Sequence, residues 1–114
     1  MLRYLVFSLL ISISAFGQNA VVAGRISDSQ NAVIAGASIE LSNRATGVRT
    51  TATANGEGYY VTAPLPPGIY DITVTAPGFS ASKVEAVTLE VGQSRTLNTQ
   101  LTVGQEQDAV TVTG

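Results

Sequence analysis

The residues that could carry out chemistry are few in this chain and lie far apart. The sequence has no histidine and no cysteine, so it lacks the commonest general base and the usual soft metal ligands. Asp28, Glu57 and Asp71 lie at or near expected turns, but a calcium site needs several oxygens within about 2.6 Å of one ion. Whole expected strands separate these acids, and we interpret them as turn and surface residues. The sequence therefore predicts no enzyme, no metal centre and no cofactor.

Two consecutive tyrosines are the residues that could contact a ligand. Tyr59 and Tyr60 follow the turn Asn55-Gly56-Glu57-Gly58, and neighbouring residues of a strand point to opposite faces, so at most one ring is exposed. We take Tyr60 as the candidate contact for a ligand or partner. Packing in the core is the favoured interpretation of the aromatic residues, and a platform that stacks on a sugar is the alternative. The glycines before them form no phosphate cradle, because no lysine and no helix follow.

Composition indicates one small domain with a packed core. The chain has 114 residues, of which 45% are hydrophobic and 12% are charged, and this balance argues against intrinsic disorder. The net charge is −2, without a run of basic residues. Because phosphate binding needs clustered lysine and arginine, the sequence argues against a nucleic-acid partner.

The first 17 residues have the pattern of a secretory signal peptide. Arg3 supplies a positive start, residues 4–16 are apolar apart from three serines, and small residues stand at Ala15 and Gly17. This apolar stretch is shorter than the roughly 20 residues that cross a bilayer, but it suits a signal sequence. We expect cleavage after Gly17 and export of the remaining chain. A buried N-terminal helix or strand is the alternative.

The remaining chain alternates between apolar and polar residues, with glycine or proline interrupting every dozen positions, as in short strands. Asn55-Gly56 predicts a hairpin turn, because both residues tolerate positive φ, and residue 56 is expected to need it. In the clearest strand, Tyr70, Ile72 and Val74 are expected to face the core, and Leu97 and Leu101 are expected core residues further on. The pattern predicts an all-β sandwich of seven antiparallel strands, at residues 22–26, 37–41, 48–54, 59–63, 70–76, 84–91 and 95–103.

The C-terminal residues break this pattern. Residues 104–108 are polar and predict a linker, whereas residues 110–114 begin another strand with nothing after it to pair with. We therefore expect a sandwich domain over residues 18–103, in a natural polypeptide that continues beyond it or in a truncated chain that once did. The threonine-rich residues 48–54 could offer an edge for pairing with another chain.

Several motifs together resemble the carboxypeptidase regulatory-like domain family. The resemblance implies a transthyretin-like Greek-key sandwich, which is grouped with carbohydrate-binding-like folds. The usual Asp-Gly turn of the family is replaced here by Asn-Gly-Glu-Gly. The motifs that carry the resemblance are Gly24, Asp28, Gly36-Ala37, Thr51, Asn55-Gly56, Gly58-Tyr59-Tyr60, Leu65-Pro66-Pro67-Gly68, Tyr70 and Gly78-Phe79.

The resemblance also implies a cell address and a role. Such domains commonly precede the plug of Oar-like TonB-dependent outer-membrane receptors, and residues 110–114 look like the start of a plug. The implied role is a non-catalytic accessory domain in the periplasm or outer membrane of a Gram-negative bacterium, with the rest of a receptor or another envelope protein as partner. Membrane contact would come only through a barrel outside these residues. The alternative is a carbohydrate-binding module with a glycan partner. Hydroxyisourate hydrolase and metallo-carboxypeptidase activities depend on histidines, which are absent.

Overall fold

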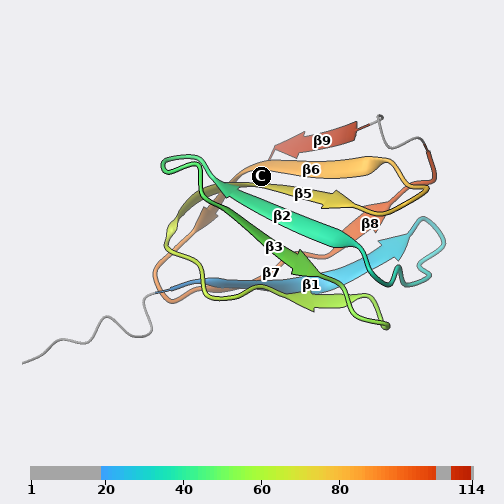
Figure 1. Cartoon of the computed structure of the whole chain (residues 1–114), viewed down its shortest axis with the longest axis horizontal. Coiled ribbons are helices and arrows are strands. Elements are labelled where there is room, and N and C mark those ends of the chain that lie inside the picture. The colour runs from blue at the N-terminus through green and yellow to red at the C-terminus, as the bar shows by residue number, and fades with distance from the viewer. Residues whose placement is uncertain (1–18, 105–108, 114) are drawn as a thin grey trace, which may run out of the picture.

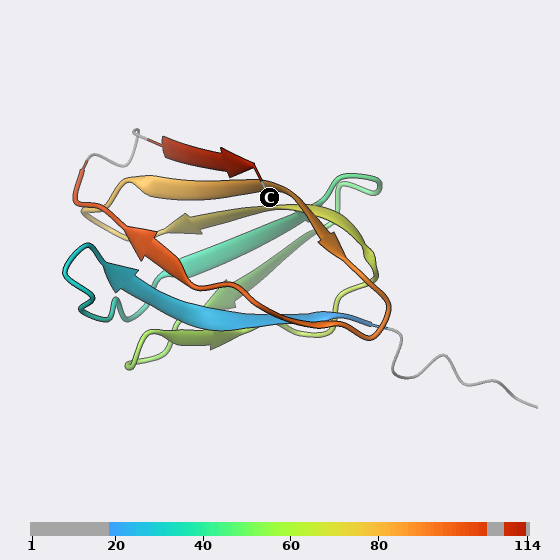
Figure 2. The ribbon, with the colours of Figure 1, turned by 180° about the vertical axis from the view of Figure 1, so that it is seen from behind.

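The computed structural model describes residues 19–104 and 109–113. The expected signal peptide (1–17), the linker residues 105–108 and Gly114 lie outside the described residues. Within them the chain forms strands joined by turns, in two facing layers that Figures 1 and 2 show from opposite sides. The strands are β1 (Val21–Asp28), β2 (Ser38–Asn43), β3 (Arg49–Thr53), β4 (Tyr59–Val61), β5 (Gly68–Thr75), β6 (Ala81–Leu89), β7 (Ser94–Thr96), β8 (Thr99–Leu101) and β9 (Ala109–Thr113).

The strands form a larger and a smaller sheet, which confirms the predicted all-β sandwich. The larger sheet has the order β3-β2-β5-β6-β9, and the smaller has the order β4-β1-β7, with β8 also paired to β1. Four pairs are antiparallel, as expected. The pairs β1–β7, β1–β8 and β6–β9 are parallel, so the expectation of purely antiparallel pairing is wrong for them. The alternation of apolar and polar residues shows which face of a strand is exposed to solvent, but it does not show the direction of the neighbouring strand.

The core lies between the sheets and contains the predicted residues of the clearest strand and Leu101, whereas Leu97, which was also expected in the core, is only partly buried against it. Tyr70, Ile72 and Val74 of β5 are buried, and they lie beside Ile39 and Leu41 of β2. The smaller sheet contributes a second buried set: Val22, Ile26 and Leu101. Each large apolar side chain buried in this way stabilises the fold by about 1.5–3 kcal/mol.

Residues 55–58 connect the two sheets, and the predicted hairpin at this point is wrong. β3 pairs with β2 in the larger sheet, whereas β4 pairs with β1 in the smaller one. The Asn55 side chain holds the connection, because its Oδ1 accepts hydrogen bonds from the N–H groups of Glu57 at 2.9 Å and Tyr59 at 3.0 Å. An Asn-Gly pair thus marks a turn from sequence, but it does not show that the flanking strands pair.

Position 58, rather than position 56, is the point of this connection at which only glycine fits. Gly58 has a φ of +81°, and a Cβ atom there would lie 2.8 Å from the carbonyl oxygen of Ile26. Neither Asn55 nor Gly56 has a positive φ, and a Cβ at Gly56 would meet open space. The expectation of positive φ at Gly56 is therefore wrong, because the four-residue connection turns at its last residue.

The predicted strand 95–103 is divided into β7 and β8. Both segments pair with β1 at one constant offset, since Val21 lies opposite Ser94 and Ile26 opposite Thr99. The pairing is interrupted only at Leu97 and Asn98, where the Asn98 side-chain Oδ1 accepts the hydrogen bond from the Arg25 N–H at 2.9 Å. β7 and β8 therefore follow β1 like one strand with a local break.

The C-terminal strand has a partner, so the expectation that it lacks one is wrong. The backbone of β9 pairs in parallel with residues 81–85 of β6 and forms an edge of the larger sheet. In Figure 2 β9 lies beside β6. The partner comes from earlier in the chain, and local sequence patterns do not reveal such a pairing.

Candidate binding surfaces

Tyr60, the predicted contact residue, lies in the core, so the expectation that it offers an exposed ring is wrong. Its side chain is only 4% exposed, and it sits opposite Gly24 of β1. The Tyr60 hydroxyl donates a 2.6 Å hydrogen bond to the carbonyl oxygen of Leu97. Burial raises the pKa of Tyr60 to about 12. The ring faces inward because Gly58 is the last residue of the connection, which leaves Tyr59 pointing outward.

Tyr59 is the exposed member of the pair, on the outer face of the smaller sheet. It is 52% exposed and lies directly opposite Arg25. Val61, two residues on, is 64% exposed and lies opposite Ala23. The Arg25 guanidinium donates to the side chain and the carbonyl oxygen of Asn31, at 3.3 and 3.4 Å. The result is a small surface with an aromatic ring, an isopropyl group and one cation.

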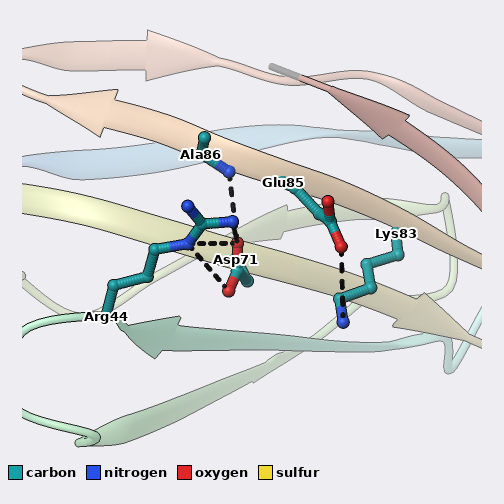
Figure 3. A network of polar contacts seen from close by, with 5 residues as sticks. All are labelled: Arg44, Asp71, Lys83, Glu85 and Ala86. Atoms are coloured by element: carbon teal, nitrogen blue, oxygen red, sulfur yellow. Dashed lines mark hydrogen bonds and ion pairs between the residues drawn. The ribbon is translucent and has the colours of Figure 1, made fainter.

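Asp71 has a structural role that the sequence did not reveal. Its carboxylate accepts hydrogen bonds from Arg44 Nε at 3.0 and 3.1 Å, and its Oδ1 forms an ion pair with Arg44 Nη2 at 2.9 Å. Asp71 Oδ1 also accepts the N–H of Ala86 at 3.1 Å. Figure 3 shows this network, with the neighbouring ion pair of Lys83 and Glu85.

The Ala86 bond explains why an acid stands at position 71. The pairing of β5 with β6 shifts register here, and Ala86 has a φ of +59°, which costs a residue other than glycine about 1–3 kcal/mol. The Asp71 carboxylate satisfies the N–H group that this bulge leaves without a ladder partner. The hydrogen bond from Arg44, and next the one from Ala86, lower the pKa of Asp71.

The other acidic residues do not converge on a site. Asp28 Oδ1 accepts hydrogen bonds from the N–H groups of Gln30 and Ala32, at 2.8 and 2.9 Å, which confirms its predicted turn role. In the described part of the chain, no three histidine, cysteine, aspartate or glutamate residues are grouped where they could hold a metal ion.

A groove lies between β6 and β8, at the open side of the sandwich. Its volume is about 360 Å³. The sequence did not predict it, because residues 95–103 were expected to form one continuous strand. Its lining is uncharged and mixes hydroxyl or amide side chains with apolar ones: Ser80, Ala81, Ser82, Val84, Leu97, Asn98, Thr99, Gln100, Leu101 and Thr102.

Thr99 is the unusual residue of this groove. Its side chain is 7% exposed, and within the described residues its Oγ1 atom has no hydrogen-bond partner. The other buried threonine, Thr62, accepts a 3.1 Å hydrogen bond from the Val22 N–H. Burial of a hydroxyl group without a partner is unfavourable, and this oxygen is itself closed to solvent.

Two facing sheets define this chain as a β-sandwich domain. A family model, that of the carboxypeptidase regulatory-like domain, matches residues 21–102. The chain belongs to this family, whose domain is a regulatory-like, non-catalytic fold. No curated protein matches the chain. Among residues 19–104 and 109–113, no helix is long and apolar enough to span a membrane.

Solved structures share the fold at low sequence identity. A proposed carbohydrate-binding protein from Bacteroides uniformis is 16% identical with a TM-score of 0.61, covering 74% of this chain and 41% of that one. A type II cohesin–X-dockerin complex from Acetivibrio cellulolyticus matches at 20% identity and a TM-score of 0.58, covering 72% and 56%. Catechol 1,2-dioxygenase from Acinetobacter radioresistens is 12% identical with a TM-score of 0.58, and the match covers 85% of this chain and 58% of that one. The chain thus spans less than two thirds of each, and the likeness shows the fold alone.

We predict that the Asp71 network makes stability depend on pH in the acid range. Because the folded-state pKa of Asp71 is lowered, its contribution is fully present above the unfolded-state pKa near 3.8 and is lost as pH falls through the folded-state pKa. The Asp71→Asn variant keeps an acceptor for Ala86 but lacks the charge. Urea unfolding should show a stability gap between wild type and Asp71→Asn at pH 6 that narrows as pH falls below about 4.

A matched control is Glu85→Gln, which removes a carboxylate from the same face. Glu85 lies 3.8 Å from Lys83, and no hydrogen bond joins it to the bulge in the described residues. Its stability gap should be smaller than that of Asp71→Asn at pH 6. A gap for Asp71→Asn that is the same at pH 6 and pH 3 would contradict the role assigned to the charged carboxylate.

Proposed function

We propose that this chain is the exported, non-catalytic N-terminal domain of a TonB-dependent outer-membrane receptor, where it binds another protein of the envelope. The observation that carries the proposal is the family match over residues 21–102, directly after a segment with a signal-peptide pattern. A domain in this position would meet partners in the periplasm of a Gram-negative bacterium. The cohesin–dockerin structure that shares the fold is itself a protein–protein complex.

The polar groups support a binding role over a catalytic one. Asp28 closes a turn, Asp71 holds a bulge and the Tyr60 hydroxyl binds a backbone carbonyl. Each of these groups is engaged in the fold, and the sequence has no histidine to act as a general base. The dioxygenase of similar fold is only 12% identical to this chain. A likeness at this level shows a shared fold and does not indicate a shared activity.

The C-terminal strand supports the receptor context. β9 adds to the edge of the larger sheet, so a following domain would start from a strand that is continuous with the sandwich. Residues 110–114 also have the Val-x-Val-x-Gly pattern that resembles the start of a plug. The domain would therefore stand directly before a plug.

Reading the natural coding sequence beyond Gly114, together with mass analysis of the exported protein, tests this proposal. We expect a frame that continues into a plug and into strands with the alternation of a membrane barrel, and a mature chain that begins at Gln18. A stop codon after Gly114 would overturn the receptor context. A mature chain that still begins at Met1 would overturn export by a cleaved signal peptide.

Glycan binding is a second candidate, favoured by the exposed ring of Tyr59 beside Arg25. A glycan array probed with the purified chain and with Tyr59→Ala tests it. Binding that is lost in Tyr59→Ala and kept in Tyr59→Phe would support a stacking platform. Binding absent from the array, or equal in Tyr59→Ala and wild type, would exclude this role for Tyr59.

A further inference from the structure

The groove between β6 and β8 exists because the two sheets differ in width. The larger sheet continues past β6 into β9, whereas β8 lies at the edge of the smaller sheet. Figure 2 shows β8 between β1 and β6. The two strands are joined at one end, where the Ser80 N–H donates to the Thr102 carbonyl oxygen at 2.8 Å and Phe79 bridges to Val103. Away from this joint, Val84 and Leu97 are only partly buried against the core.

The edge of β8 that faces the groove carries unpaired backbone groups. Among the described residues β8 pairs only with β1. The Thr102 carbonyl points away from β1, toward Ser80, and every second residue of a strand directs its backbone groups to the same side. The N–H and C=O groups of Gln100 therefore point toward the groove. Such an edge is a template for one more strand.

The side chains of the groove determine which strand would fit. Its lining has no charged residue, and a charged side chain placed there would be desolvated without a counter-ion. Aromatic rings, which a sugar platform needs, are absent from this lining.

We propose that β8 is a site of strand addition for an extended peptide segment of a partner protein. The segment pairs with the backbone of Gln100 and extends the smaller sheet. Its groove-facing side chains are uncharged. This strand covers Val84 and Leu97. The proposal deepens the proposed function by naming the surface and the chemistry of the protein partner.

The β3 edge of the larger sheet is a weaker candidate. The Asn43 N–H donates to the Val48 carbonyl oxygen, so the backbone groups of Val48 point toward β2. Because the direction alternates along a strand, the backbone groups of Arg49, Thr51 and Thr53 point away from β2. The side chains of these three residues are all exposed, and they line no groove with an unsatisfied buried group. Thr51 is therefore a matched control for Gln100, since both are edge residues with an exposed side chain.

Titration of the exported chain with a synthetic peptide tests the proposal. The probe is acetyl-Gly-Ser-Val-Thr-Val-Ser-Gly-amide, and amide hydrogen exchange is followed by NMR. We expect exchange of the Gln100 amide to slow at least tenfold at saturating peptide, with shift changes at Ser82 and Thr102. Two N-methylated versions of the peptide, each methylated on one set of alternate residues, should differ, and only one should bind.

Variants separate this site from the alternatives. Gln100→Pro removes the edge N–H and should weaken binding at least tenfold, whereas Thr51→Pro should leave it unchanged. If Gln100→Pro does not fold, the two methylated peptides still test the proposal on the wild-type chain.

Three results would overturn the proposal: no slowed exchange at Gln100 at millimolar peptide, loss of binding in Thr51→Pro instead of Gln100→Pro, or equal binding of both methylated peptides. Slowed exchange at Gln100 caused by a soluble oligosaccharide and not by the peptide would also overturn it. These outcomes are independent of the receptor context, which depends on the coding sequence beyond Gly114. Each proposal can therefore fail without the other.

Discussion

The hydrogen bond between the Tyr60 hydroxyl and the Leu97 carbonyl is the interaction on which the smaller sheet depends. The Leu97 carbonyl turns out of the ladder and lies against Gly24, where any Cβ atom would collide with it. The Tyr60 hydroxyl donates a 2.6 Å hydrogen bond to this carbonyl oxygen. The Arg25 N–H then bonds to the Asn98 side-chain oxygen instead of to a backbone carbonyl of the ladder. With these three groups in place, residues 94–101 follow β1 in parallel on both sides of the break. The position of β8, and with it the groove, follows from this arrangement.

Several motif residues therefore serve the path of the chain between the sheets. Gly24 admits the Leu97 carbonyl, Gly58 completes the connection from β3 to β4, and Asn55 holds that connection through its side chain. Asp71 serves the larger sheet in the same way, because it binds the N–H of a strained residue, Ala86. What remains for recognition is the outer face around Tyr59 and the uncovered edge of β8.

The fold class and much of the core could be predicted from the sequence, because alternation along a strand is a local property. Tyr70, Ile72 and Val74 are buried as predicted, and Asp28 closes its turn. The strand partners could not be predicted, since pairing depends on residues far apart in the chain. The hairpin at Asn55-Gly56 failed for this reason. The prediction that Tyr60 is the exposed ring was wrong because a change of one residue in the length of the turn reverses which tyrosine faces the core.

The most direct test of the central role of Tyr60 is the free energy of unfolding of Tyr60→Phe in urea, with Tyr59→Phe as the control. Removal of the Tyr60 hydroxyl leaves the Leu97 carbonyl without its partner, which should cost about 1–3 kcal/mol. Tyr59→Phe changes an exposed ring and should stay within about 0.5 kcal/mol of wild type. If Tyr60→Phe is as stable as wild type, the Leu97 carbonyl does not need this bond, and the account of the smaller sheet is contradicted.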